Sequence, residues 1–274
     1  MRSFAALITL TFVSFYLFFF VALPANSQDL NFQSAFENYL GARDSYNREY
    51  SEFQKARDFY LATKTLVQKE NVRRETYEML ISRDDLMSAY LTAIWSRLYQ
   101  TPGGGGNEKS DILSDLVGEI DWYKNHKSIY NQDLDTLETL FDKSKGAKKH
   151  HEETTSFYIY ETLATIAFSK YRDTKTKFEN IYQEVKSKTE GAEGNKKALY
   201  DRWIADIDRK FQEVTDIEVE IKEIIEEFRS DKRRNPDETY RRAIAKANEA
   251  KDAIVMIGGF LSELLVAVNS SNGQ

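Results

Sequence analysis

The chain has 274 residues with no cysteine, three prolines and 12 glycines, and its 44 Asp and Glu outnumber 38 Lys and Arg to give a formal charge of −6. Without cysteine there are no disulfides, thiolate nucleophiles or Cys-ligated metals. The acidic balance argues against nucleic acid as a partner, because a polyanion binds a basic face. The scarcity of proline and glycine favours long uninterrupted helices over a β-rich fold with many turns.

The N-terminal segment 1–27 predicts export. A positive charge at Arg2 precedes an uncharged, largely apolar stretch at residues 4–23, and a proline and small residues follow before Gln28. This is the layout of a secretory signal peptide. The apolar stretch is also long enough to span a bilayer as an uncleaved anchor. Both alternatives place the rest of the chain outside the cytoplasm, where it is secreted, periplasmic or held at the cell surface.

Beyond this segment, apolar residues recur at alternating spacings of three and four, which is the pattern of helices that pack along one face. No stretch sustains the period of two that is typical of a strand. We therefore predict an all-α fold, an elongated antiparallel helical bundle or coiled coil of five or six long helices packed as one domain. The predicted parts after the signal are a long helical segment at 28–100, a Gly-rich linker at 101–109, and bundle segments within 110–274 at 110–145, 148–189, 196–231 and 236–269.

The segment 28–100 allows two interpretations. A seam of Phe and Tyr residues and a second seam, which includes Asp84 among apolar residues, are separated by the polar run Gln68–Thr76. The chain either crosses this run as one helix or turns near Asn71. Since no strong stop signal lies there, we favour a continuous or kinked helix.

Two motifs suggest a ligand site, and neither meets its requirements. The stretch Gly103–Ser110 ends in Lys-Ser after a glycine run, but a phosphate-binding loop needs glycine where Glu108 stands. His150 and His151 are adjacent, so on a helix they point about 100° apart and do not converge on one metal ion. We expect them, like His126, to lie in solvated charged stretches. The sequence thus predicts no catalytic, cofactor-binding or metal-binding residue, no cofactor and no enzymatic activity.

The last predicted helix is unusual, because only Ser262 and Glu263 are polar between Ala253 and Val268. A helix that is apolar nearly all round is buried on most sides, so we expect a central core helix. An oligomer interface and a membrane-inserting segment are the alternatives. The predicted interaction or core face consists of Ile254, Ile257, Phe260, Leu261, Leu264 and Leu265.

These features together predict a non-enzymatic, exported helical-bundle protein of the cell envelope or extracellular space. We expect it to act as a scaffold or as a binding or adhesion module, through a protein partner or through self-association, and not on nucleic acid. Membrane contact would come through residues 4–23 if the leader stays uncleaved. The alternatives are a secreted, pore-forming-like helical protein that inserts into membranes and an extracytoplasmic sensor-type helical domain.

Overall fold

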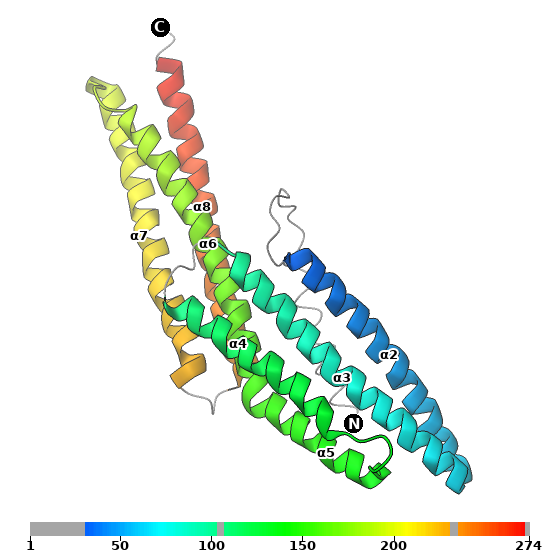
Figure 1. Cartoon of the computed structure of the whole chain (residues 1–274). Helices are drawn as coiled ribbons and strands as arrows, with labels where there is room; N and C mark the ends of the chain where they lie inside the picture. Colours follow the sequence, from blue (N-terminus) through cyan, green and yellow to red (C-terminus); the bar gives the residue numbers. More distant parts are fainter. Residues whose placement is uncertain (1–30, 103–106, 231–234, 272–274) are drawn as a thin grey trace. The chain divides into compact units, whose positions relative to one another are not determined.

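A computed structural model describes residues 31–102, 107–230 and 235–271, and within these ranges all regular structure is helical. The predicted all-α class is therefore confirmed (Figure 1). The proposed leader at 1–27 and the glycine run at 103–106 lie outside the described residues. The elements are α2 (Phe32–Thr63), α3 (Leu66–Gln100), α4 (Asn107–His126), a 3-10 turn η1 (Lys127–Ile129), α5 (Leu137–His150), a π-helical turn η2 (His151–Thr155), α6 (Ser156–Ser187), α7 (Gly194–Ser230) and α8 (Pro236–Ser271).

The first two helices form a hairpin instead of the continuous helix that we expected. The chain reverses at Lys64, whose φ of 50° lies in the left-handed region, and at Thr65. The Thr65 side chain caps α3 by accepting a hydrogen bond from the backbone N–H of Gln68 at 3.3 Å. This turn comes six residues before Asn71. The polar run that we took as a candidate break instead forms the first turns of α3.

The next turn also lies at a different place from the predicted one. The predicted helix 110–145 is divided, because α4 ends at His126 and a loop leads to α5. Asn131 shapes this loop by accepting hydrogen bonds from two backbone N–H groups at 3.0 Å, and Thr136 caps α5 by accepting from the N–H of Thr139. The expected break near Gly146 is absent, and α5, η2 and α6 follow one another without interruption. If these three count as one rod, the described residues form six long helical rods.

The C-terminal helices α6, α7 and α8 share one apolar core. The rings of Tyr160 and Tyr240 lie 5.4 Å apart near one end of α6 and α8, and Phe178 packs against Gly258 farther along. These contacts show that α6 and α8 run in the same direction, with α7 antiparallel to both (Figure 1). The largest fully buried side chains of this core are Ile207, Ile221 and Ile257.

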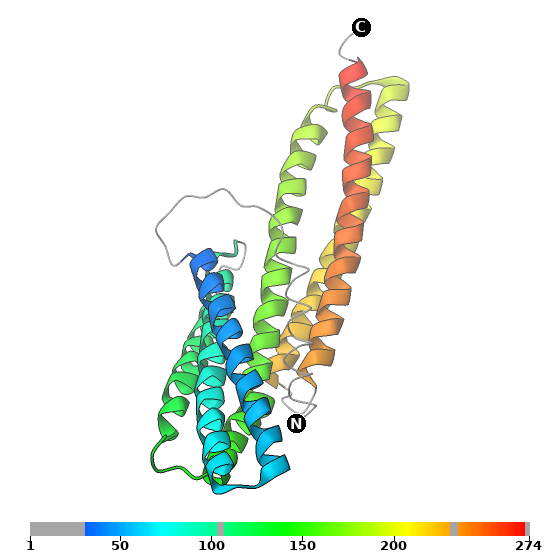
Figure 2. The same ribbon diagram turned by 90° about the vertical axis from the view of Figure 1, so that its right-hand side faces the viewer.

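Helix α3 is central to the remaining part, because it contacts α2, α4, α5 and α6. Its Leu91, Ile94 and Leu98 are fully buried, as are Ile112 and Leu116 of α4. Helix α6 belongs both to the core of α6, α7 and α8 and to the group of helices around α3. Its first turns lie against α3 and α4, while its length packs on α8 (Figure 2). The π-helical turn η2 lies between α5, which packs on α3, and α6, which enters the core with α7 and α8.

Candidate functional site

The six residues singled out in the last helix are divided between its core side and its surface. Phe260 packs partly buried against the core of α6, α7 and α8, whereas Leu265 is 37% exposed. The other four point into the core, so most of this face is used in packing within the chain. The four buried residues are Ile254, Ile257, Leu261 and Leu264.

The opposite side of α8 is exposed and apolar in its C-terminal half. Val255 and Val266 are 62% and 66% exposed, and Met256 is also exposed. The expectation that this helix is buried on most sides is therefore wrong, because α6 and α7 are the helices of the described residues that pack closely on it. By length and composition α8 is also the one helix in the described ranges that is apolar enough to cross a membrane. We call the exposed apolar residues and Gly259 the apolar stripe, which consists of Val255, Met256, Gly259, Leu265 and Val266, with the exposed Ser262 and Glu263 among them.

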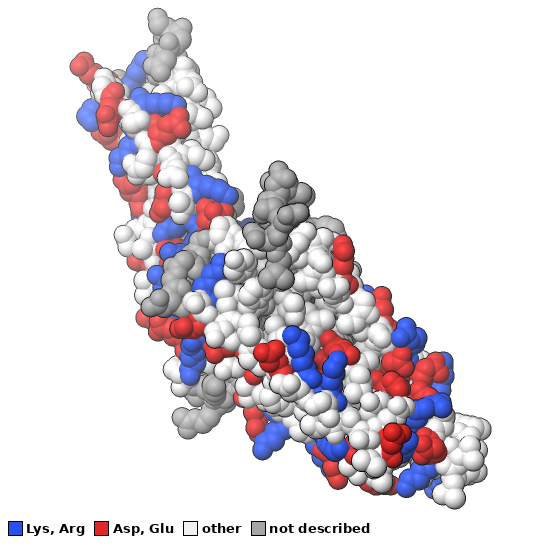
Figure 3. All heavy atoms as spheres, in the orientation of Figure 1, with Lys and Arg blue, Asp and Glu red and all other residues white. Residues whose placement is uncertain are grey.

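The number of charged residues on the outer side of α8 also falls from its N-terminal half to its C-terminal half. The exposed positions of its N-terminal half include Arg241, Glu249 and Asp252, whereas Glu263 is the only charged residue from Ala253 to Asn269. In Figure 3 the upper end of α8 is accordingly almost free of red and blue, while both colours are frequent on the helices beside it. A contiguous apolar surface of this kind marks an interaction site more often than scattered single apolar residues do.

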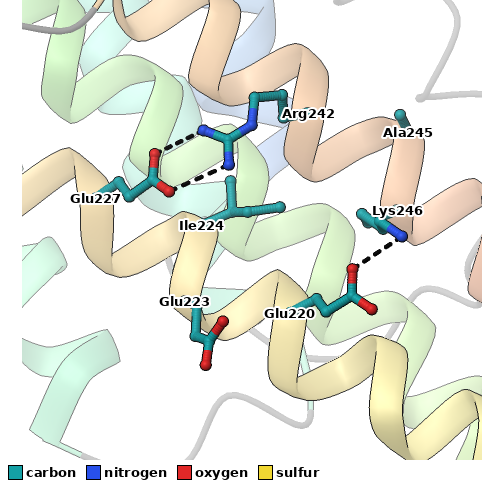
Figure 4. Close-up of a pocket in the computed structure, with 7 residues that line it drawn as sticks. All are labelled: Glu220, Glu223, Ile224, Glu227, Arg242, Ala245 and Lys246. Carbon is teal, nitrogen blue, oxygen red and sulfur yellow. Dashed lines mark hydrogen bonds and ion pairs between the residues drawn. The ribbon is translucent and has the colours of Figure 1, made fainter.

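A shallow groove of about 310 Å³ lies between α7 and the N-terminal half of α8 (Figure 4). Arg242 spans it with hydrogen bonds of 2.7 and 3.2 Å to the two carboxylate oxygens of Glu227. Lys246 pairs with Glu220 at 2.8 Å. Because carboxylates already neutralise both cations, the groove is lined by ion pairs between the two helices. It has little positive charge left to bind an anion. Its lining residues are Glu220, Glu223, Ile224, Glu227, Arg242, Ala245 and Lys246.

All three histidines of the chain meet at the junction of α3, α4 and η2, which corrects the expectation that they are solvated. His126 is buried at the end of α4 and donates from Nδ1 to Oδ2 of Asp84 on α3 at 2.6 Å. The fully buried Asp84 also accepts from Nε and Nη2 of Arg83 at 3.0 and 2.9 Å. Arg83 in turn donates to the Tyr130 hydroxyl at 2.9 Å. The buried guanidinium of Arg83 and the buried carboxylate of Asp84 therefore neutralise each other.

A second group of hydrogen bonds surrounds Glu119 of α4. His150 donates from Nε2 to the Glu119 carboxylate at 2.9 Å, and the Thr155 hydroxyl donates to the same oxygen at 2.6 Å. Since Thr155 uses its proton there, it accepts from the Tyr123 hydroxyl at 3.2 Å. Burial raises the pKa of Tyr123, so its hydroxyl stays protonated and can donate.

The π-helical turn explains how His150 and Thr155 reach one oxygen. Residues five apart lie on different sides of an α-helix, whereas the wider turn of a π-helix, bonded from i to i+5, brings them to the same side. The turn His151–Thr155 directly follows His150. Isolated π turns of this kind are frequent at functional sites.

Trp122 joins the two groups of hydrogen bonds. Its ring is stacked between His126, at 4.6 Å and 15°, and His150, at 3.7 Å and 11°. Next to this stack, burial and the nearby positive charges of Arg83 and His150 lower the pKa of His151 to about 4. We call this cluster the histidine layer, which consists of Arg83, Asp84, Glu119, Trp122, Tyr123, His126, Tyr130, His150, His151 and Thr155.

The histidine layer was missed because its members are far apart in the sequence. One signal was available, since Asp84 occupies a position on an otherwise apolar helical seam, where an acid must find a buried partner.

No group of three or more His, Asp or Glu side chains in the described ranges is arranged to hold a metal ion. The hydrogen bonds of the layer join α3 and α4 with η2, and the His151 imidazole can take up a proton as the pH falls. Comparison with protein-family models, with curated proteins and with solved structures finds no match for this chain.

Proposed function

We propose that this chain is an exported, non-enzymatic helical-bundle protein that works as a binding module, and that the apolar stripe on α8 is the surface through which it binds. The observation that carries the proposal is the exposure of Val255, Met256 and Val266 on one side of a helix whose other side is fully used in the core. Leaving these side chains in water is unfavourable by an amount proportional to their apolar area. A partner that covers them recovers this free energy.

A second copy of the chain is the partner that fits the stripe best. Gly259 lies in the middle of the stripe, and a Cβ added there would meet no atom within 4 Å. The backbone of another helix can therefore approach closely at that point. Most dimers are two-fold symmetric and bring one surface patch of each subunit together. Glu263 is the one charged residue exposed among these residues, so the stripe brings only one acidic side chain per copy into a contact with itself.

Sedimentation velocity over a range of protein concentrations tests this proposal. We expect the wild-type protein to self-associate, and Val255→Glu and Met256→Glu to sediment as monomers, because each places a charge inside the apolar contact. Val219→Glu is the matched control, since Val219 is a similarly exposed apolar residue on α7. A wild-type protein that stays monomeric, or a control that dissociates as readily as the α8 variants, would contradict the proposal.

The location outside the cytoplasm is a separate part of the proposal and is supported by residues 1–27. The charge at Arg2, the uncharged stretch at 4–23 and the small residues before Gln28 together favour a cleaved export signal. Fractionation of the native host followed by mass measurement tests it. We expect an extracytoplasmic protein that begins at Gln28 or retains the leader as an anchor. A cytosolic protein with an intact leader would refute this location.

Membrane insertion through α8 is the second candidate function. It is supported by the length and apolar composition of α8, most of whose apolar window is not buried within the chain. Glu263 opposes this function, because a charge within a spanning segment is costly. Leakage of a dye from liposomes tests it: a membrane-inserting protein would release the dye, and Met256→Glu would suppress the release.

A further inference from the structure

A second apolar surface lies far from α8, at the end of the α2–α3 hairpin. Leu66, Leu134 and Val67 are 86%, 80% and 74% exposed, which makes them the three most exposed large apolar side chains in the described ranges. Phe59 and Leu61, on the last turns of α2, are also exposed. Single exposed apolar residues are ordinary, but five at one end of a helical unit need an explanation. We call these five residues the apolar tip.

Contacts between α3 and the α4–α5 loop bring Leu134 to the same end as the hairpin turn. The ammonium of Lys69 lies 2.9 Å from the Glu138 carboxylate, and Arg73 donates to the backbone carbonyls of Gln132 and Asp135. These contacts fix the loop beside the first turns of α3. Figures 1 and 2 both show the hairpin turn and this loop at one end of the helices α2–α5.

The charges at the hairpin turn are positive. From Phe59 to Lys69 the only charged residues are Lys64 and Lys69, and Lys64 is exposed at the turn itself. Asp133 is exposed beside Leu134, and Glu138 pairs with Lys69, so Lys64 is the cation at the turn that no carboxylate of the described residues pairs with. An apolar tip with this ammonium group at its turn complements a bilayer that contains anionic lipids, because the apolar side chains enter the acyl boundary while the ammonium group stays at the headgroups.

The backbone at the turn is also suited to contact with lipid, where polar groups that lack hydrogen bonds are costly. The N–H of Lys64 donates to the carbonyl of Tyr60 at 2.7 Å, and the Thr63 hydroxyl donates to the carbonyl of Phe59 at 2.9 Å. On the other side of the turn, the N–H of Gln68 donates to the Thr65 side chain. Much of the hydrogen bonding at the tip is therefore satisfied within the hairpin.

We propose that the apolar tip inserts into the surface of a bilayer that contains anionic lipids. The bilayer is favoured over a protein partner because the chain reverses within two residues and so presents a convex end, whereas helices bind proteins along a face or in a groove. This contact does not depend on the apolar stripe of α8. The two surfaces lie on different helices and are tested with different substitutions.

The absence of cysteine permits a direct test by single-site labelling of the full chain. Leu66→Cys and Val219→Cys, each carrying an environment-sensitive fluorophore, are mixed with phosphatidylcholine vesicles with and without phosphatidylglycerol. We expect the emission at position 66 to shift to shorter wavelength on the vesicles with phosphatidylglycerol, and to be quenched by a lipid-bound quencher. The emission at position 219 should stay unchanged. A label at position 66 that remains in water, or an equal shift at position 219, would overturn the proposal and leave a protein as the occupant of the tip.

A second measurement separates the tip from the other apolar segments. Leu66→Asp combined with Val67→Asp should lower partitioning onto the phosphatidylglycerol vesicles at least about tenfold relative to the same chain with Val219→Asp. Circular dichroism should stay unchanged, because all three residues are exposed. If Met256→Asp on α8 lowered the partitioning while the tip substitutions did not, the membrane contact would belong to α8 and this proposal would fail.

Discussion

At the scale of single residues, the neighbours Asp84 and Asp85 show how burial decides what a carboxylate contributes. Asp84 is fully buried between Arg83 and His126, whereas Asp85 forms an exposed pair with Lys127 at 2.6 Å. We expect Asp84→Ala to lower the free energy of unfolding by about 3–5 kcal/mol, because it leaves a guanidinium in the core without its carboxylate. Asp85→Ala should cost less than about 1 kcal/mol.

Urea denaturation of both variants measures this difference. Asp85→Ala is the matched control, because it removes the same carboxylate one position along the same helix. Equal losses of stability at the two positions would show that the histidine layer does not have the paired arrangement described above.

His151 gives the histidine layer a dependence on pH. Its pKa is lowered from 6.5 to about 4 in the folded chain, chiefly by burial and then by the charges of Arg83 and His150. The unfolded chain therefore binds a proton first as the pH falls, so stability is fully present above about pH 6.5 and declines until about pH 4. The full shift corresponds to about 3 kcal/mol, and the partial exposure of the side chain to water reduces this value.

The comparison of His151→Gln with the wild type isolates this effect. The variant should lose less stability than the wild type between pH 6.5 and pH 4, as measured by urea denaturation at each pH. Parallel stability curves for the two proteins over this range would show that His151 does not remain neutral in the folded state.

At the scale of helices, two adjacent glycines of α8 have opposite environments. A Cβ on Gly258 would lie 3.0 Å from Cε1 of Phe178 on α6, whereas a Cβ on Gly259 would meet nothing within 4 Å. We expect Gly259→Ala to stabilise the isolated monomer by up to about 1 kcal/mol, because alanine is the better helix former and has room there within the chain. Gly258→Ala should gain less or lose stability, since Phe178 must move. Thermal denaturation of both variants would contradict this packing if they gained equally.

Some helix ends could be predicted from sequence and others could not. Asn235 and the glycines from Gly191 to Gly194 are strong signals, and α7 and α8 begin beside them. The turn at Lys64 has no such signal, because lysine rarely adopts a left-handed φ and only the Thr65 cap marks the position. Gly146 is a false stop signal, because helix α5 continues through it. A Cβ added there would lie 3.9 Å from Nε2 of His126, which is an ordinary contact distance.

At the scale of the whole molecule, the apolar residues spaced three and four apart predict that the helices pack together. They do not predict which helices are neighbours. The apolar residues of α8 show this limit: their number predicts burial, yet in the part of the chain that the structure describes α6 and α7 cover one side of α8 and the other side is exposed. The histidine layer was not predicted for the same reason, because it depends on α3, α4 and η2 meeting at one level. The apolar stripe and the apolar tip could not be predicted from sequence either, because the exposure of each residue depends on which helices cover it.

The proposed role of the apolar stripe of α8 is to join two copies of this chain. Photo-crosslinking tests it most directly, with a photoreactive amino acid in place of Met256 in one protein and in place of Val219 in another. We expect a crosslinked dimer from position 256, joined within residues 253–269 of the second copy, and none from position 219. A chain that stays uncrosslinked at position 256, or that crosslinks equally from both positions, would contradict it.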